Sequence, residues 1–94
     1  MRFVWDEEKN RRNRAKHRVS FETAKLVFDD PRALSRLDET QENEERWITI
    51  GLAAKIVVLL VVHTAHEEGG EETIRIISAR KATPRERKAY ENGI

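Results

Sequence analysis

The chain of 94 residues is long enough for one small domain and too short for a second. It has no cysteine, which excludes a disulfide scaffold, a thiolate zinc site and a cysteine nucleophile. Its longest apolar run, residues 56–62, is far shorter than the roughly 20 residues that span a bilayer, and no signal segment follows Met1. We therefore expect a cytoplasmic protein with no membrane partner.

The net charge of +1 conceals a segregation of charge along the chain. Residues 1–25 carry eight basic and four acidic side chains, residues 26–72 carry four and eleven, and residues 73–94 carry six and two. If the two basic ends meet in the fold, they form one face that could attract a polyanion. The alternative is that these charges only solvate helix surfaces.

Two helices are predicted in the first third of the chain. Asp6 is a favoured N-cap, and the acidic residues after it and the basic residues further on suit a helix over residues 6–17. This helix has almost no apolar residue except Ala15, so it should lie on the surface. Ser20 is a second candidate N-cap, and the apolar residues after it predict a better-packed helix that ends at Asp29-Asp30-Pro31.

The middle of the chain predicts an antiparallel sheet, because alternating or continuous apolar segments are separated by polar ones. The expected strands cover residues 33–37, 46–52, 56–62 and 73–79. The expected connections are an acidic loop over residues 38–44, a turn at 53–55 and a hairpin loop over 65–72.

The last element has the clearest local signals. Thr83-Pro84-Arg85-Glu86 reads as a capping box with proline at the first helical position, and Asn92-Gly93 supplies a stop, so we expect a helix over residues 84–91. The whole chain then forms a single α+β domain over residues 1–94, with two N-terminal helices, a three- to four-stranded antiparallel sheet and a C-terminal helix.

Two histidines near the end of the apolar strand are candidates for chemistry. His63 and His66 have a spacing that suits a metal ion, but no third ligand is fixed, so we expect no metal site. A lone His63 at a strand end could titrate near neutral pH and transfer protons. The alternative is a partly exposed histidine without a catalytic role.

Basic side chains cluster where the last strand passes into the last helix: Arg75, Arg80, Lys81, Arg85 and Arg87. Arg80 and Lys81 directly precede a helix N-terminus, where free N–H groups and cations together suit a phosphate. Glu86 and Tyr90 lie one turn apart on that helix. The alternative is a solvated helix start, with Glu86 acting only as a cap and Tyr90 packed on the sheet.

These groups permit RNA cleavage without a metal ion or cofactor, although composition does not select it. Such cleavage needs a base for the 2′-OH, an acid for the leaving 5′-oxygen and cations for the charged pentavalent phosphorus. The expected catalytic residues are His63, Arg75, Arg80, Glu86 and Tyr90. The expected RNA-binding residues are Arg46, Lys81, Arg85, Arg12 and Arg14.

Three segments of the chain, taken together, point to a family. They are Phe3-Val4-Trp5-Asp6 with Lys16-His17 and Val19-Ser20-Phe21-Glu22; Val27-Phe28-Asp29-Asp30 followed by Glu44-Glu45-Arg46-Trp47-Ile48-Thr49-Ile50-Gly51; and Arg75-Ile76-Ile77-Ser78-Ala79-Arg80-Lys81-Ala82-Thr83 with Glu86-Arg87 and Tyr90-Glu91. The chain resembles the BrnT family, the toxin half of a bacterial type II toxin–antitoxin pair. It departs from the family at Arg18, where a glycine usually follows Lys-His. If that glycine is a helix C-cap, Arg18 must adopt a strained conformation or the helix must end differently.

The resemblance implies a RelE-like ribonuclease fold and RNA cleavage that arrests growth. It also implies a BrnA-like antitoxin partner with a ribbon-helix-helix domain, a heterotetramer as the complex, and contact with operator DNA only through the antitoxin. An alternative is a RelE/ParE-like protein with no chemistry of its own that grips a partner such as gyrase.

Overall fold

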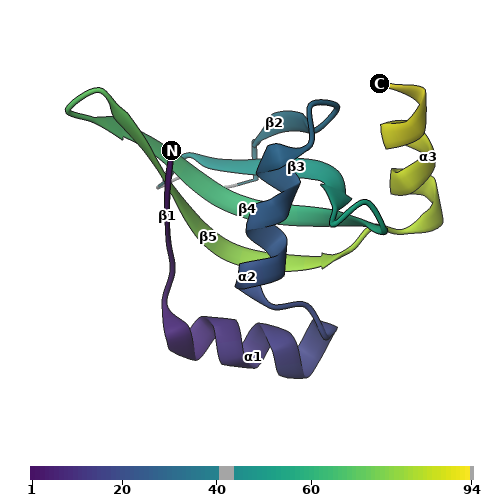
Figure 1. Ribbon diagram of the computed structural model, residues 1–94, viewed down its shortest axis with the longest axis horizontal. Coiled ribbons are helices and arrows are strands. Elements are labelled where there is room, and N and C mark those ends of the chain that lie inside the picture. The colour runs from purple at the N-terminus through teal and green to yellow at the C-terminus, as the bar shows by residue number, and fades with distance from the viewer. Residues whose placement is uncertain (41–43, 94) are drawn as a thin grey trace.

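The computed structural model describes residues 1–40 and 44–93, which form a five-stranded sheet with helices beside it (Figure 1). In chain order, its elements are β1 (Arg2–Val4), α1 (Glu7–His17), α2 (Phe21–Ala24), the 3₁₀ helix η1 (Lys25–Asp29), β2 (Leu34–Asp38), β3 (Arg46–Ala53), β4 (Val57–Glu68), β5 (Glu71–Lys81) and α3 (Pro84–Asn92). The acidic loop expected over residues 38–44 lies partly outside the described residues, because residues 41–43 are not among them.

The sheet has the strand order β1-β5-β4-β3-β2. The pairs β5–β4, β4–β3 and β3–β2 are antiparallel, whereas β1 runs parallel to β5 and pairs Phe3 with Ile74. The expectation of a purely antiparallel sheet with three or four strands was therefore wrong. Three residues are too few to show a strand period, so β1 could not be predicted from its residues.

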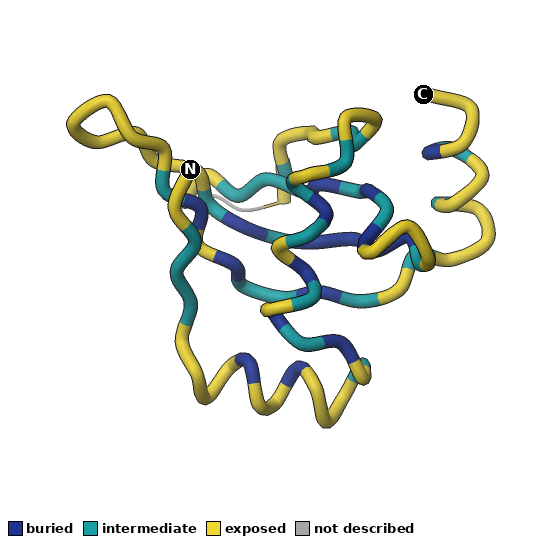
Figure 2. Tube along the Cα trace, viewed as in Figure 1, coloured by how far each residue is buried: buried dark blue, intermediate teal, exposed yellow. Residues whose placement is uncertain are grey.

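The hairpin loop expected over residues 65–72 is instead strand for most of its length. The β4–β5 ladder continues from Ala65 paired with Ile74 to Glu68 paired with Glu71. The chain reverses at Gly69 and Gly70, which both have positive φ, as a two-residue hairpin turn requires. The glutamates lie on a two-stranded ribbon exposed to water, shown in yellow in Figure 2, so their charge is compatible with strand.

The core lies between the sheet and the α2–η1 segment. Ser20 caps α2 by accepting a hydrogen bond from the Thr23 N–H at 3.1 Å, as expected. The expected second helix changes to 3₁₀ geometry at Lys25. The core packs apolar side chains from both sides of this interface: Phe21, Ala24, Val27, Leu59, Val61, Ile74, Ile76 and Ala79.

A β-bulge in β5 decides which side chains face the core. Val62 pairs with Ser78 and His63 pairs with Ile76, so Ile77 is an extra residue in β5. Strict alternation along the expected strand 73–79 would place Ser78 on the face of Ile74 and Ile76, but the structure does not follow it. The bulge shifts the phase, so that Ala79 is buried as deeply as Ile76, at 1% exposure. The side chains of Arg75 and Arg80 are thereby directed to the face opposite the core.

Helix α1 is attached to the sheet by amide side chains. Asp6 caps its N-terminus as expected, and its buried residues are Asn10 and Asn13. The Asn13 side chain donates to Ala79 O at 2.8 Å and accepts from Ala79 N at 3.1 Å, in the manner of a neighbouring strand. It also donates to Val19 O at 2.8 Å. The Asn13 side chain thus hydrogen-bonds to the outer edge of β5, at a position past the end of β1.

Helix α1 ends at a residue under backbone strain. Arg18 is its C-cap and has left-handed geometry, with φ 59° and ψ 30°, while its N–H donates to Arg14 O at 2.9 Å. This conformation costs a residue with a side chain roughly 1–2 kcal/mol relative to glycine. The strain expected from the replacement of glycine at this position is therefore present.

We predict that Asn13→Ala lowers the free energy of unfolding by about 3 kcal/mol, because it leaves the buried Ala79 N–H and C=O unpaired. Urea unfolding monitored by tryptophan fluorescence measures the change. Lys16→Ala, at an exposed position of the same helix, is the control and should change stability by less than about 0.5 kcal/mol. Equal effects of the two substitutions would show that α1 is held by something other than the Asn13 amide.

Candidate functional site

The junction between β5 and α3 is fixed by a cap and an ion pair. The predicted capping box is present: Thr83 Oγ1 accepts from Glu86 N at 3.1 Å, and a Glu86 carboxylate oxygen accepts from Thr83 N at 2.8 Å. The same carboxylate accepts two hydrogen bonds from the Arg80 guanidinium, at 2.8 and 2.9 Å. This bidentate pair holds Arg80 against the first turn of α3, where Lys81 and Arg85 are exposed beside it.

The ion pair determines the protonation of Glu86. Its hydrogen bonds to Arg80 lower the pKa of the Glu86 carboxyl to about 2, and the Thr83 N–H acts in the same direction. Glu86 is therefore ionised at neutral pH, and a carboxylate with so low a pKa is a weak general base. In this geometry Glu86 positions Arg80 and is poorly suited to accept a proton.

Tyr90 is hydrogen-bonded to the carboxylate of Asp30, a residue expected only to end the second helix. Its ring is buried, and its hydroxyl donates to Asp30. Asp30 also accepts from Leu52 N at 2.8 Å and from Arg32 N at 2.9 Å, so one carboxylate links η1, β3 and α3. The hydrogen bond to Asp30 raises the pKa of the Tyr90 hydroxyl. No local pattern around Asp30 indicates this role, because its partners are distant in sequence.

His63 lies in the core and not at a strand end. β4 continues five residues beyond His63, and the residue is only 4% exposed. The Phe28 ring packs edge-on against the imidazole, with 4.9 Å between the ring centres. Its Nε2 is 2.7 Å from Thr49 Oγ1, and burial lowers the pKa of the imidazole. The expectation that His63 lies at a strand end was wrong, because the strand is longer than its apolar part. His63 also faces the side of the sheet opposite Arg80.

The remaining expected cations are divided between two other places. Arg75 forms an ion pair with Glu44, whose carboxylate also lies 3.8 Å from the Arg46 guanidinium. Since Arg75 precedes Arg80 by five residues of strand, this pair lies about 16 Å along β5 from the junction. Arg12 and Arg14 are exposed on α1. Arg46 and Arg75 thus form one group, and Arg80, Lys81 and Arg85 form another. The expectation that Arg75 belongs to the cluster at the junction was wrong, because the chain between Arg75 and Arg80 is extended strand.

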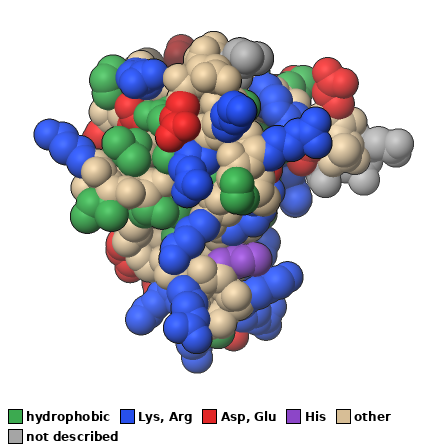
Figure 3. Space-filling view, turned by 90° about the vertical axis from the view of Figure 1, so that its right-hand side faces the viewer, with side chains coloured by type: hydrophobic (Ala, Val, Ile, Leu, Met, Phe, Trp, Pro, Cys, Tyr) green, Lys and Arg blue, Asp and Glu red, His purple; other side chains and the backbone are tan. Residues whose placement is uncertain are grey.

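The two basic ends of the chain meet at one end of the molecule. The Asn13–Ala79 hydrogen bonds place the C-terminal half of α1 next to the last residues of β5, directly before Arg80. Figure 3 looks onto this end and shows Lys and Arg side chains gathered across it, most densely over its lower part. The two basic segments of the sequence therefore form one basic face, here called the basic end. It comprises residues 11–18, at the end of α1 and its C-cap, and residues 80–88.

The structure also bears on metal ligation and membrane insertion. Among the described residues, no three histidine, aspartate or glutamate side chains lie together in a group that could hold a metal ion. His63 is buried, whereas His66 is exposed and three residues further along the same strand, on its other face. Within residues 1–40 and 44–93, no helix has the length and apolar character needed to cross a membrane.

Comparison with known proteins identifies the family. A model of the BrnT ribonuclease toxins of type II toxin–antitoxin systems matches residues 5–86. The chain belongs to the BrnT family. The crystal structure of the Brucella abortus ribonuclease toxin BrnT is similar, with a TM-score of 0.62 and 25% sequence identity, over 88% of this chain and 97% of that chain. No curated protein matches the sequence.

In this BrnT-family protein, the groups expected to transfer protons differ from the cations in accessibility. His63 is buried, Tyr90 donates to Asp30, and Glu86 is ion-paired. Lys81 and Arg85 are exposed, and the Arg80 side chain is 39% exposed. The accessible groups at the β5–α3 junction are therefore cations beside the capped N-terminus of α3, an arrangement that suits a phosphate.

The lowered pKa of His63 predicts a loss of stability between pH 7.5 and 5.5. Below the unfolded-state pKa of about 6.5, the unfolded chain binds a proton that the folded chain does not, so the free energy of unfolding falls as pH falls. Urea unfolding across this range should show the slope in the native protein and a smaller one in His63→Gln. His66→Gln is the matched variant at an exposed position. A slope that survives in His63→Gln and is lost in His66→Gln would contradict the assignment.

Proposed function

We propose that this ribonuclease toxin cleaves RNA at the β5–α3 junction without a metal ion, mainly by electrostatic stabilisation. The observation that carries the proposal is the bidentate Arg80–Glu86 pair at the capped N-terminus of α3. A guanidinium that is already positioned for two parallel hydrogen bonds has the geometry that a phosphate also takes. Lys81 and Arg85 add positive charge at the same place.

A phosphate that replaces Glu86 as the partner of Arg80 would change both groups. Arg80 would then neutralise charge on the pentavalent phosphorus, where preorganised cations contribute most to the rate. Glu86 would lose the hydrogen bonds that hold its pKa at about 2, so its pKa would rise toward its ordinary value. Glu86 would then become a better base for the 2′-OH proton at the moment when the substrate is bound.

The partner proposed for this toxin is a BrnA-like antitoxin with a ribbon-helix-helix domain. Type II toxins act as pairs with a protein antitoxin, and the match to the BrnT family supports that partnership. We further propose a heterotetramer, in which the antitoxin alone contacts operator DNA, and a cytoplasmic RNA substrate. The basic end is available for RNA when the antitoxin is absent.

A second candidate function is a RelE/ParE-like toxin that grips a partner such as gyrase. One observation favours it: in the described structure, the three residues expected to transfer protons are all engaged in the core or in hydrogen bonds. A protein that acts only by binding needs no free acid or base. The distinction depends on whether RNA is cleaved.

We predict that the purified toxin cleaves naked RNA in the presence of EDTA, and that Arg80→Ala slows this cleavage by about 10²–10³-fold. Removing one preorganised donor to a charged transition state has an effect of this size. Arg75→Ala should also reduce cleavage and growth arrest, although its side chain lies further along β5. Rates are measured on a labelled single-stranded RNA, and growth arrest is measured after induction at equal expression.

Arg87→Ala is the matched control, because Arg87 is an exposed arginine on α3 and is not paired with Glu86 in the structure. Thermal unfolding of all variants separates loss of fold from loss of activity. If Arg80→Ala remains fully active, the cleavage site lies elsewhere. If the native protein leaves RNA intact but traps DNA breaks by gyrase, the second candidate function is correct.

A further inference from the structure

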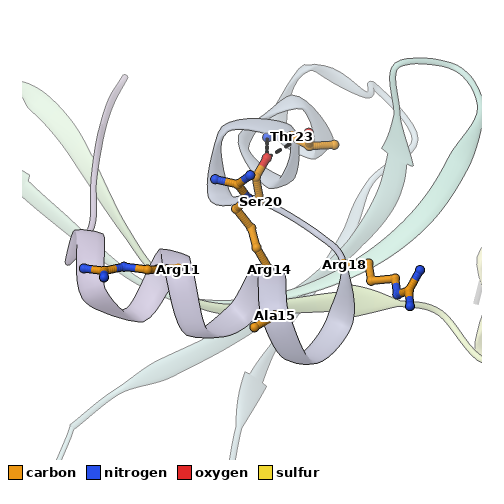
Figure 4. Close-up of a pocket in the computed structure, with 6 residues that line it drawn as sticks. All are labelled: Arg11, Arg14, Ala15, Arg18, Ser20 and Thr23. Carbon is orange, nitrogen blue, oxygen red and sulfur yellow. Dashed lines mark hydrogen bonds between the residues drawn. The ribbon is translucent and has the colours of Figure 1, made fainter.

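A groove on the basic end is separate from the β5–α3 junction. It lies between α1 and the start of α2, is open to solvent and has a volume of about 700 Å³. Its lining comprises Arg11, Arg14, Ala15, Arg18, Ser20 and Thr23. Figure 4 shows the Arg14 side chain extending from α1 toward Ser20, with Arg11 and Arg18 at the two ends of the groove. The three arginines thus form a row along one side of α1.

Three of the six residues that line the groove are arginines, and none is acidic. Across residues 1–40 and 44–93, neither Arg14 nor Arg18 forms a salt bridge. Arg11 pairs with Glu8 at 2.6 Å, but their side chains are 76% and 50% exposed, so the pair is weak and easily exchanged for another anion. The Ser20 and Thr23 hydroxyls, 3.0 Å apart, add polar hydrogen-bonding groups to the opposite wall.

Arg18 occupies its place at the end of the groove at an energetic cost. Its left-handed backbone would be relaxed by glycine and is better tolerated by asparagine. A strained residue with a charged side chain beside a groove is the kind of outlier that indicates a functional constraint. Here the constraint that fits is retention of a third cation in the row.

The groove and the β5–α3 junction belong to the same end of the molecule. Asn13 lies within the α1 segment that carries Arg11 and Arg14, and it hydrogen-bonds Ala79, the residue before Arg80. Because Arg80 points to the face of the sheet opposite α2, a polyanion bound there would have to pass around α1 to reach the groove. The lining holds one small apolar side chain, Ala15, and lacks the apolar or aromatic pocket on which a bound peptide usually depends.

We propose that the Arg11–Arg14–Arg18 groove binds the phosphodiester backbone of single-stranded RNA outside the cleaved bond. The inference rests on the proposed ribonuclease function, since it places the part of the substrate that flanks the β5–α3 junction. Binding there is independent of base sequence, because arginine and hydroxyl groups contact phosphate oxygens. It supplies affinity and orientation, whereas Arg80 supplies stabilisation at the reacting phosphate.

The test uses a fluorescent 2′-O-methyl RNA oligonucleotide, which lacks the free 2′-OH and is therefore not cleaved. Fluorescence anisotropy at increasing salt gives its affinity for the full chain. Arg14→Gln and Arg18→Asn should each weaken binding by about tenfold at roughly 0.1 M salt. Each should also reduce the slope of log affinity against log salt by about 0.7, the value for one single-strand phosphate contact.

Two features of the variants separate binding from folding. Arg18→Asn relieves backbone strain, so it should raise the unfolding temperature while it lowers RNA affinity. Lys16→Gln removes an exposed cation from the basic end but outside the groove, so it should weaken binding clearly less than Arg14→Gln does. Equal weakening by Lys16→Gln and Arg14→Gln would overturn the groove assignment, because only total charge would then matter.

The remaining outcomes distinguish this inference from the proposed function. If the native chain cleaves ordinary RNA but both groove variants bind the 2′-O-methyl probe as tightly as it does, the function stands and the groove proposal fails. If the native chain binds the probe through the groove yet cleaves no RNA, the groove proposal stands and the ribonuclease function fails. If the variants lose affinity for the antitoxin but not for the probe, the groove is a protein contact and the proposal is wrong.

Discussion

One amide side chain connects the two basic segments of this protein. Helix α1 is almost entirely polar and buries only Asn10 and Asn13 among its residues. Its attachment therefore depends on hydrogen bonds, and Asn13 provides the pair that replaces a neighbouring strand along β5. Because Ala79 directly precedes Arg80, the same contact sets the position of the α1 arginines relative to the β5–α3 junction. A toxin with nearly zero net charge obtains a basic end in this way.

The parts of the fold that follow from the sequence are those decided by local chemistry. The caps at Asp6, Ser20 and Thr83 were predicted because each cap and its partners lie within four residues. The Ile77 bulge and the parallel pairing of β1 were missed, since both depend on a partner strand distant in sequence. The charged end of the β4–β5 hairpin was also missed. A strand is recognised in a sequence by alternating apolar residues, and neither face of this hairpin end is buried.

In the candidate site, too, local features were predicted and contacts between distant residues were not. The cluster of cations at the junction was predicted from the order of residues alone, whereas the strain at Arg18 was expected from the resemblance to a family that usually has glycine there. The surroundings of the groups expected to transfer protons were not predicted, because His63 contacts Thr49 and Tyr90 contacts Asp30, and both partners are distant in the chain. Electrostatic stabilisation is accordingly the contribution that we propose for the β5–α3 junction in RNA cleavage.

The most direct test of this account is an NMR titration of the isotope-labelled full chain with uncleavable single-stranded RNA. The account predicts that backbone amide signals shift in two segments, residues 79–86 at the β5–α3 junction and residues 11–23 around the α1 groove. Signals from the β4–β5 hairpin around Gly69 should stay in place, since glutamates surround it. Shifts confined to that hairpin or to β2, with both predicted segments unchanged, would contradict the account.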